Sequence, residues 1–172
     1  SLVDPQDYFV PKKSILNKIV GDSQLELDVA ECLDGCDDIV SFVKNSELKM
    51  DYRNAEGGIS NYIPDFIVKE SPDTYHVLET KGREDIDDAS KFERLEQWCA
   101  DATATEQGPK YYPLYVREGD WLSYRPRTFE QLRKLGSRPK RAVPPAIPAE
   151  LEQRFAGLVM RWREKTRFSS TA

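Results

Sequence analysis

Two apolar stretches joined by a short turn constrain the fold of this chain most strongly. Residues 61–69 and 75–81 are rich in β-branched and aromatic side chains, which is typical of strands, and a turn-forming segment around Pro72 lies between them. A hairpin centred on Pro72 places Asp65 opposite Glu79 and Ile63 opposite Lys81, and opposed side chains lie about 5 Å apart at Cβ. We therefore expect two carboxylates and an ammonium group to meet on a face that otherwise carries Ile, Val and Tyr.

This cluster of charges is costly unless something neutralises it. Two carboxylates at such a distance repel each other, and partial burial penalises each charge. A divalent cation removes both penalties because carboxylate oxygens bind it, and Pro64 can aim Asp65 at such a site from a bulge. The alternative is an ordinary surface salt bridge, but apolar residues flank the charges on both strands.

A third acid, Glu26, lies near the start of a predicted helix. Ser23 and Glu26 have the spacing of a capping box, and that role alone could explain the glutamate. Glu26 also shares a helical face with Val29 and Leu33, so it is predicted to point toward the sheet, whereas Glu31 is predicted to face solvent. We favour Glu26 over Glu31 as a site residue.

The remaining patterns predict an α/β fold. Strands are expected at residues 38–44, 48–53, 61–69, 75–81 and 111–116, and helices at 23–35, 87–102, 128–135 and 149–165; residues 13–20 can form a short helix. This order predicts a sheet with helices packed on it. We divide the chain into a lead segment (1–22), a core (23–124) and a basic, Pro-rich linker with an amphipathic C-terminal helix (125–172).

Composition excludes several classes of protein. His76 is the one histidine, so a Ser-His-Asp triad or a His-Cys zinc cage would need it, and nothing around it supports either. The three cysteines form no disulfide framework and favour a reducing, cytoplasmic setting. No apolar run approaches the ~20 residues of a membrane span, and the first residues are not typical of a signal peptide.

The net charge of −5 argues against nucleic-acid binding, but the charge is unevenly distributed. Residues 125–167 contain 12 Lys+Arg and 4 Asp+Glu, a balance of +8 that leaves −13 for the remainder. An acidic body can hold metal while a basic stretch holds phosphate, although a solvated helical surface explains the basic stretch equally well. Candidate phosphate contacts are Arg83, Lys91, Arg94, Arg133, Lys134, Arg138, Lys140 and Arg141.

A helix glutamate, then Pro-Asp, then Glu-x-Lys in the next strand resembles the pattern of the PD-(D/E)XK nuclease superfamily. The pattern stands here as Glu26, Pro64-Asp65 and Glu79-Thr80-Lys81. With Lys44-Asn45, Tyr52-x-Asn54, Tyr62, Gly82, Lys91 and Trp98, the chain resembles, over roughly residues 20–117, the endonuclease domain at the C-terminal end of type III restriction enzyme Res subunits.

The resemblance implies a restriction-endonuclease-like mixed central β-sheet flanked by α-helices, and cleavage of DNA with Mg²⁺, for which Mn²⁺ can substitute. It implies that Asp65, Glu79 and the main-chain carbonyl of Thr80 bind metal, that Lys81 orients or activates the attacking water, and that Glu26 assists. Such subunits also carry an ATP-driven helicase or translocase. This chain has no G-x-x-x-x-G-K-[ST] motif, so a motor would be another region of a parent protein or a separate subunit.

Two other functions stay open at this point. One is a non-catalytic module of the same fold that binds DNA or docks a partner. The other is a protein-interaction domain that uses the C-terminal helix and the region of Trp121 and Tyr124. DNA binding that persists in chelator without cleavage would indicate the first, and no affinity for nucleic acid the second.

Overall fold

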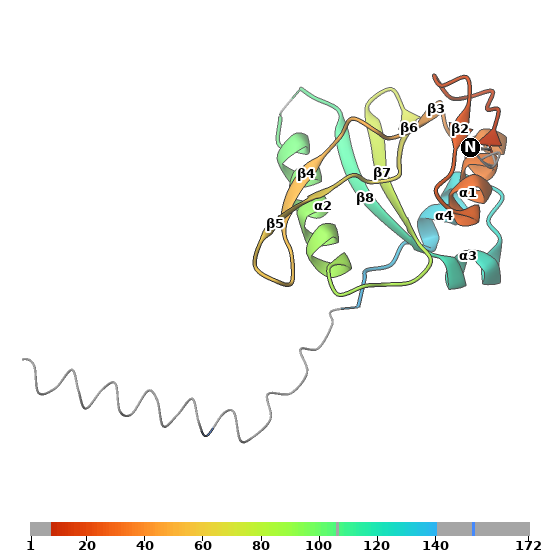
Figure 1. Cartoon of the computed structure of the whole chain (residues 1–172). Helices are drawn as coiled ribbons and strands as arrows, with labels where there is room; N and C mark the ends of the chain where they lie inside the picture. Colours follow the sequence, from red (N-terminus) through yellow and green to blue (C-terminus); the bar gives the residue numbers. More distant parts are fainter. Residues whose placement is uncertain (1–7, 106, 141–152, 154–172) are drawn as a thin grey trace, which may run out of the picture. The chain divides into compact units, whose positions relative to one another are not determined.

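A four-stranded mixed sheet organises the chain in the computed structural model, which describes residues 8–105, 107–140 and 153. The strand order is β3-β6-β7-β8 (Figure 1), with antiparallel pairing from β3 to β7 and parallel pairing of β7 with β8. Helices cover both faces, which confirms the predicted restriction-endonuclease-like α/β fold. The strands of this sheet are β3 (Ser41–Lys44), β6 (Phe66–Ser71), β7 (Thr74–Lys81) and β8 (Lys110–Arg117).

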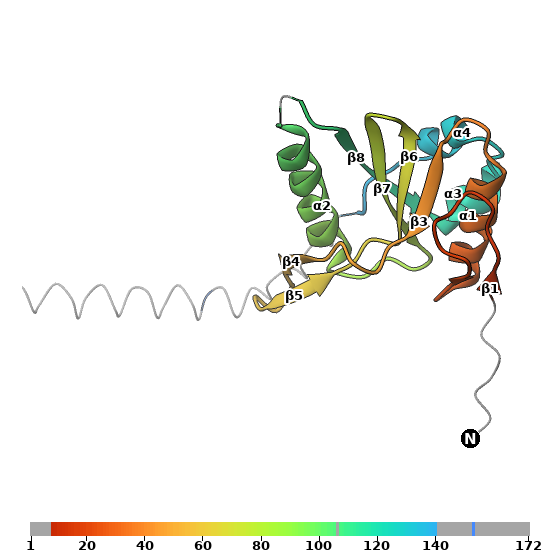
Figure 2. The ribbon, with the colours of Figure 1, turned by 90° about the horizontal axis from the view of Figure 1, so that it is seen from above.

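Two separate cores form on the two faces of the sheet (Figure 2). On one face, α1 packs with α3 and α4 around Leu33, Phe66 and Phe129. On the other, α2 and a small hairpin pack around Leu95 and Tyr115. The helices are α1 (Gln24–Gly35), α2 (Asp88–Thr103), α3 (Glu118–Tyr124) and α4 (Phe129–Lys134), and the hairpin strands are β4 (Met50–Arg53) and β5 (Ile59–Tyr62).

The register of the β6–β7 hairpin agrees with the predicted centre at Pro72. Phe66 pairs with Leu78 and Lys69 with Tyr75, and a bulge follows before the turn. The single strand predicted over residues 61–69 is wrong, because β5 ends at Tyr62 and β6 begins at Phe66. Pro64 has no N–H to donate to a ladder, so the chain leaves one sheet and enters another at this point, and Ile63 lies outside both strands.

The N-terminal segment and one helix also differ from expectation. A short helix at residues 13–20 is wrong: β1 (Tyr8–Phe9) pairs with β2 (Ile19–Val20), and Ile19 enters the core. The helix α3 was not predicted. Phe129 and Leu132 of α4 are fully buried and pack in the α1-side core. The helix predicted at 149–165 lies outside the described residues apart from Gln153.

Within the described ranges, no helix combines the length and the apolar character that crossing a membrane requires.

Candidate active site

Asp65 lies in the break between β5 and β6, where hydrogen bonds from two directions fix it. The main-chain N–H and the hydroxyl of Thr80 both donate to its Oδ2, at 2.7 Å each. Behind it, the N–H of Asn45 donates to the Asp65 carbonyl at 2.7 Å, and the Asn45 amide donates to the carbonyl of Pro64 at 2.9 Å. The carboxylate is thus held at the edge where β6 meets the end of β7.

Glu79 extends from β7 toward the same edge, as the predicted pairing with Asp65 requires. The Tyr62 hydroxyl donates to Glu79 Oε2 at 3.0 Å. Burial and the nearby charge of Asp65 raise the pKa of Glu79 to about 8. Burial also raises the pKa of Asp65, although its hydrogen bonds from Thr80 oppose this shift. Both carboxyl groups are therefore poorly solvated, and the charge of Asp65 acts on Glu79.

Lys81 ends β7 and forms ion pairs with acids of the following segment. Its Nζ lies 2.8 Å from Asp88 Oδ1 and 3.3 Å from Asp85 Oδ2. Burial opposes the charge of Lys81, but the hydrogen bonds and charges of Asp88 and Asp85 together outweigh it and raise the lysine pKa. The ammonium group is therefore charged, and carboxylates hold it beside Glu79.

Glu26 points toward the sheet, as predicted, and Glu31 is exposed. The predicted cap is present in a modified form: Ser23 Oγ accepts from the N–H of Glu26, but the Glu26 carboxylate accepts from the N–H of Asp22 at 3.2 Å, one residue before the N-cap. The main partner of Glu26 is the ammonium group of Lys44, which the sequence reasoning did not select as a site residue.

Lys44 links Glu26 to the site. Its Nζ forms an ion pair with Glu26 and lies 4.0 Å from Asp65 Oδ1. Burial opposes the charge of this lysine, but the bond to Glu26 and the charge of Asp65 prevail and raise its pKa. A buried cation between two acids lowers their repulsion. The available signal was the position of Lys44 at the end of β3, next to the buried Asn45.

The donor set fits a divalent cation of the magnesium class. In the described part of the chain, no group of three or more His, Cys, Asp and Glu gathers in a metal-binding arrangement. What the site offers is two carboxyl groups, Asp65 and Glu79; burial raises the pKa of each, and the charge of Asp65 raises that of Glu79 further. Carboxylate oxygens are the ligands that ions of the magnesium class prefer, and such ions keep several of their waters.

The basic residues predicted to contact phosphate fall into two groups. Lys91 joins the Lys81 cluster, with its Nζ 3.3 Å from Asp85 Oδ2. Arg83 is exposed just after β7, and Arg94 follows Lys91 by one turn on α2. Of this first group, the structure joins Lys91 to Lys81 through shared aspartates, and it places Arg83 and Arg94 in the segments that follow β7.

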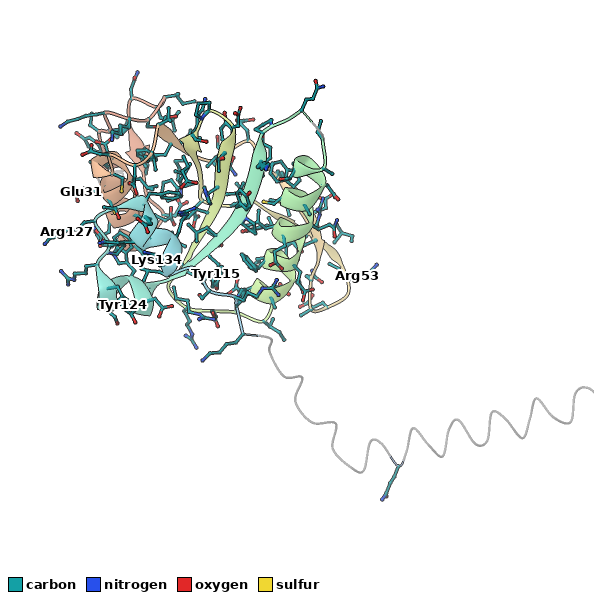
Figure 3. All side chains as sticks on the ribbon, turned by 180° about the vertical axis from the view of Figure 1, so that it is seen from behind. Glu31, Arg53, Tyr115, Tyr124, Arg127 and Lys134 are labelled. Carbon is teal, nitrogen blue, oxygen red and sulfur yellow. The ribbon has the colours of Figure 1, made fainter. Side chains whose placement is uncertain are left out.

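The second group lies elsewhere or is engaged with acids. Arg133 pairs with Glu70, which is near the end of β6 opposite to Asp65. Lys134 pairs with Glu130 on α4, on the α1 side of the sheet (Figure 3). Arg138 pairs with Glu96, and the main-chain N–H of Lys140 donates to Glu84 at 3.4 Å. Arg141 lies outside the described residues.

Of the two aromatic side chains suggested as a protein-interaction surface, one is buried and one is exposed. Trp121 is 7% exposed and belongs to the α1-side core, so it cannot act as a contact residue. Tyr124, at 72% exposed, is accessible.

Comparisons with known proteins add one match. The model of a family described as "Endonuclease domain" matches residues 12–108, which is more than half of the chain. The matched range contains Glu26, Asp65, Glu79 and Lys81. A search of curated proteins and a search of solved structures found no match.

Proposed function

Given that the chain belongs to the endonuclease domain family, we propose that it is a metal-dependent nuclease that hydrolyses phosphodiester bonds of DNA. The observation that carries the proposal is a pair of poorly solvated carboxyl groups, Asp65 and Glu79, with Lys81 at the end of the strand that carries Glu79. Burial, and then the charge of Asp65, raise the pKa of Glu79 to about 8. Buried like charges of this kind are typical of functional sites.

Each residue of the site has a definite part in this reaction. Asp65 and Glu79, with the main-chain carbonyl of Thr80, are the ligands that would hold Mg²⁺ or Mn²⁺. When bound, such an ion polarises a phosphate oxygen and acidifies a water molecule. Lys81 stabilises negative charge on the attacking oxygen or on the phosphorus centre.

The surrounding residues keep the ligands in place. Thr80 holds one oxygen of Asp65 through two donors, and Tyr62 holds one oxygen of Glu79. Lys44 offsets the charges of Glu26 and Asp65. In this arrangement Glu26 assists the site through Lys44, which it holds beside Asp65.

We further propose that the chain is the nuclease part of a larger DNA-processing enzyme, of the kind represented by the type III restriction Res subunits. The chain has no P-loop motif, so an ATP-driven motor would be supplied by another region or by a separate subunit. A cytoplasmic setting, with reduced Cys32, Cys36 and Cys99, fits this proposal.

Cleavage of supercoiled plasmid tests the proposed function. The purified protein is incubated with Mg²⁺, with Mn²⁺ and with chelator, beside Asp65→Ala, Lys81→Ala and, as a matched control, Glu31→Gln on the exposed face of α1. Metal-dependent nicking that the first two substitutions abolish and the control retains is the expected result.

Two other outcomes would redirect the proposal. DNA binding in chelator, with an intact plasmid in both metals, would favour the non-catalytic DNA-binding module. If the wild type neither cleaves the plasmid nor binds metal in calorimetry, the nuclease proposal is refuted.

A further inference from the structure

Two lysines and two aspartates form a compact charge cluster beside the carboxylate pair. Asp85 Oδ2 lies 3.3 Å from Lys81 Nζ and 3.3 Å from Lys91 Nζ. Asp88 Oδ1 lies 2.8 Å from Lys81 Nζ and 3.4 Å from Lys91 Nζ. Each lysine thus faces both carboxylates, and one oxygen of Asp85 bridges the two ammonium groups.

The two aspartates have different environments. The side chain of Asp88 is 2% exposed, and its Oδ2 accepts from the N–H of Asp85 at 2.6 Å. It also begins α2, where a negative charge is favourable. Asp88 is therefore a fixed part of the fold, and it holds the two lysines close together.

Asp85 is held much less firmly. Its side chain is 50% exposed and lies in the loop between β7 and α2. Apart from the lysines, the carboxylate accepts from the N–H of Asp87 at 2.8 Å, through its other oxygen. The Oδ2 that bridges the lysines can turn away without removing a buried bond. If it does, two ammonium groups share the single carboxylate of Asp88, and the cluster has a net charge of +1.

We propose that Lys81 and Lys91 form a binding subsite for a phosphate group of the DNA backbone, and that the Asp85 carboxylate occupies the place of that phosphate in the free protein. An anionic oxygen 3.3 Å from both ammonium groups is the contact that a phosphate oxygen would make with them. The inference rests on the proposed function, since it assumes that DNA is the substrate.

A consequence for binding follows from this competition. DNA must displace Asp85 before its phosphate reaches the lysine pair, so the loop aspartate lowers the affinity. Displacement also frees Lys81 from one of its two carboxylates at the moment when substrate arrives beside Glu79. Asp85 thus limits non-productive contacts of the free lysine pair with other anions.

The test compares DNA affinities without any cleavage. Fluorescence anisotropy with a labelled duplex in chelator is recorded for the wild type, Asp85→Asn, Lys91→Gln and the double variant. Asp85→Asn retains an oxygen that can accept from the N–H of Asp87. Glu118→Gln is the matched control, since Glu118 is an exposed acid beside Gly82 that contacts neither lysine.

We expect Asp85→Asn to bind DNA roughly fivefold more tightly at low salt, the change that corresponds to loss of a competing exposed ion pair. Glu118→Gln should change the affinity by less than about twofold. In the Lys91→Gln background the gain from Asp85→Asn should shrink, because one of the two ammonium groups is gone.

Equal gains for Asp85→Asn and Glu118→Gln would overturn the subsite, as would a full gain that persists without Lys91. Either result leaves the nuclease proposal standing if the plasmid is cleaved. Failure of every variant to bind DNA would overturn the subsite together with DNA as the substrate.

Discussion

Asn45 gives the sharpest test of how the fold positions Asp65. The side chain is 7% exposed and makes four hydrogen bonds. Its amide group donates to the carbonyls of Pro64 and Leu48 at 2.9 Å each. Its oxygen accepts from the N–H groups of Glu47 and Leu48 at 3.2 and 2.8 Å.

The cost of Asn45→Ala can be worked out from these bonds. Each is worth about 1 kcal/mol net. The groups of the adjoining turn can be hydrated in the variant, but the bond to the Pro64 carbonyl is buried, and an unsatisfied buried acceptor costs about 1–3 kcal/mol. We expect the free energy of unfolding to fall by about 2–4 kcal/mol. Asn45→Asp should cost at least as much at neutral pH, because it places an oxygen against two carbonyls.

Urea denaturation, followed by tryptophan fluorescence, measures the free energy of unfolding of both variants. The control is Ser46→Ala, the exposed neighbour, whose change should remain within about 0.5 kcal/mol. Calorimetric titration with Mn²⁺ should show weaker binding by Asn45→Ala at temperatures where it is still folded, since Asp65 loses its support. A loss of stability below about 1 kcal/mol, or normal stability of Asn45→Asp, would refute this reasoning.

Three further outcomes follow from single contacts. Tyr62→Phe should weaken Mn²⁺ binding about tenfold in calorimetry, because the carboxylate of Glu79 loses its orienting donor; an unchanged affinity would contradict this role. Asp38 accepts the N–H groups of Phe129 and Glu130, so Asp38→Ala should cost about 1 kcal/mol in urea denaturation. Burial raises the pKa of Asp38, but these hydrogen bonds outweigh it and hold the pKa below 3.8. The stability difference between wild type and Asp38→Ala should therefore be present above pH 3.8 and vanish as the pH falls through the lowered pKa. Burial holds the pKa of His76 below 6.5, so on lowering the pH the unfolded chain gains a proton before the folded protein does. The free energy of unfolding of the wild type should therefore fall more steeply than that of His76→Gln between about pH 7 and about pH 5. Parallel pH curves for the two proteins would contradict this prediction.

The hairpin shows how far the sequence predicts the fold. Alternation and one turn were enough to place Asp65 and Glu79 at the same edge, because a two-residue period leaves no freedom once the turn is fixed. The sequence did not reveal that Tyr62 and Phe66 belong to different sheets. Both residues fit a strand pattern, and the break between them depends on which partners the backbone finds across space.

The missed site residues have a common cause. Judged only by their neighbours along the chain, Lys44 and Asp88 are predicted to be solvated surface charges. Their partners, Glu26 and Lys81, lie 18 and 7 positions away. Burial of such groups depends on tertiary contacts, which alternation cannot report. Asp65, Glu79 and Lys81 were found because they sit close together around one hairpin, within 16 residues of each other along the chain.

The outer edge of β8 has a consequence for solubility. β8 is the last strand of the sheet, and such an edge can recruit a strand from another molecule. Here the returning chain covers it: the N–H of Ser137 donates to the Tyr115 carbonyl at 3.0 Å, and Arg117 donates to the carbonyl of Arg138. Pro113 removes a further N–H from β8. A chain cut before residue 137 should therefore aggregate through β8, even where its carboxylate pair is intact.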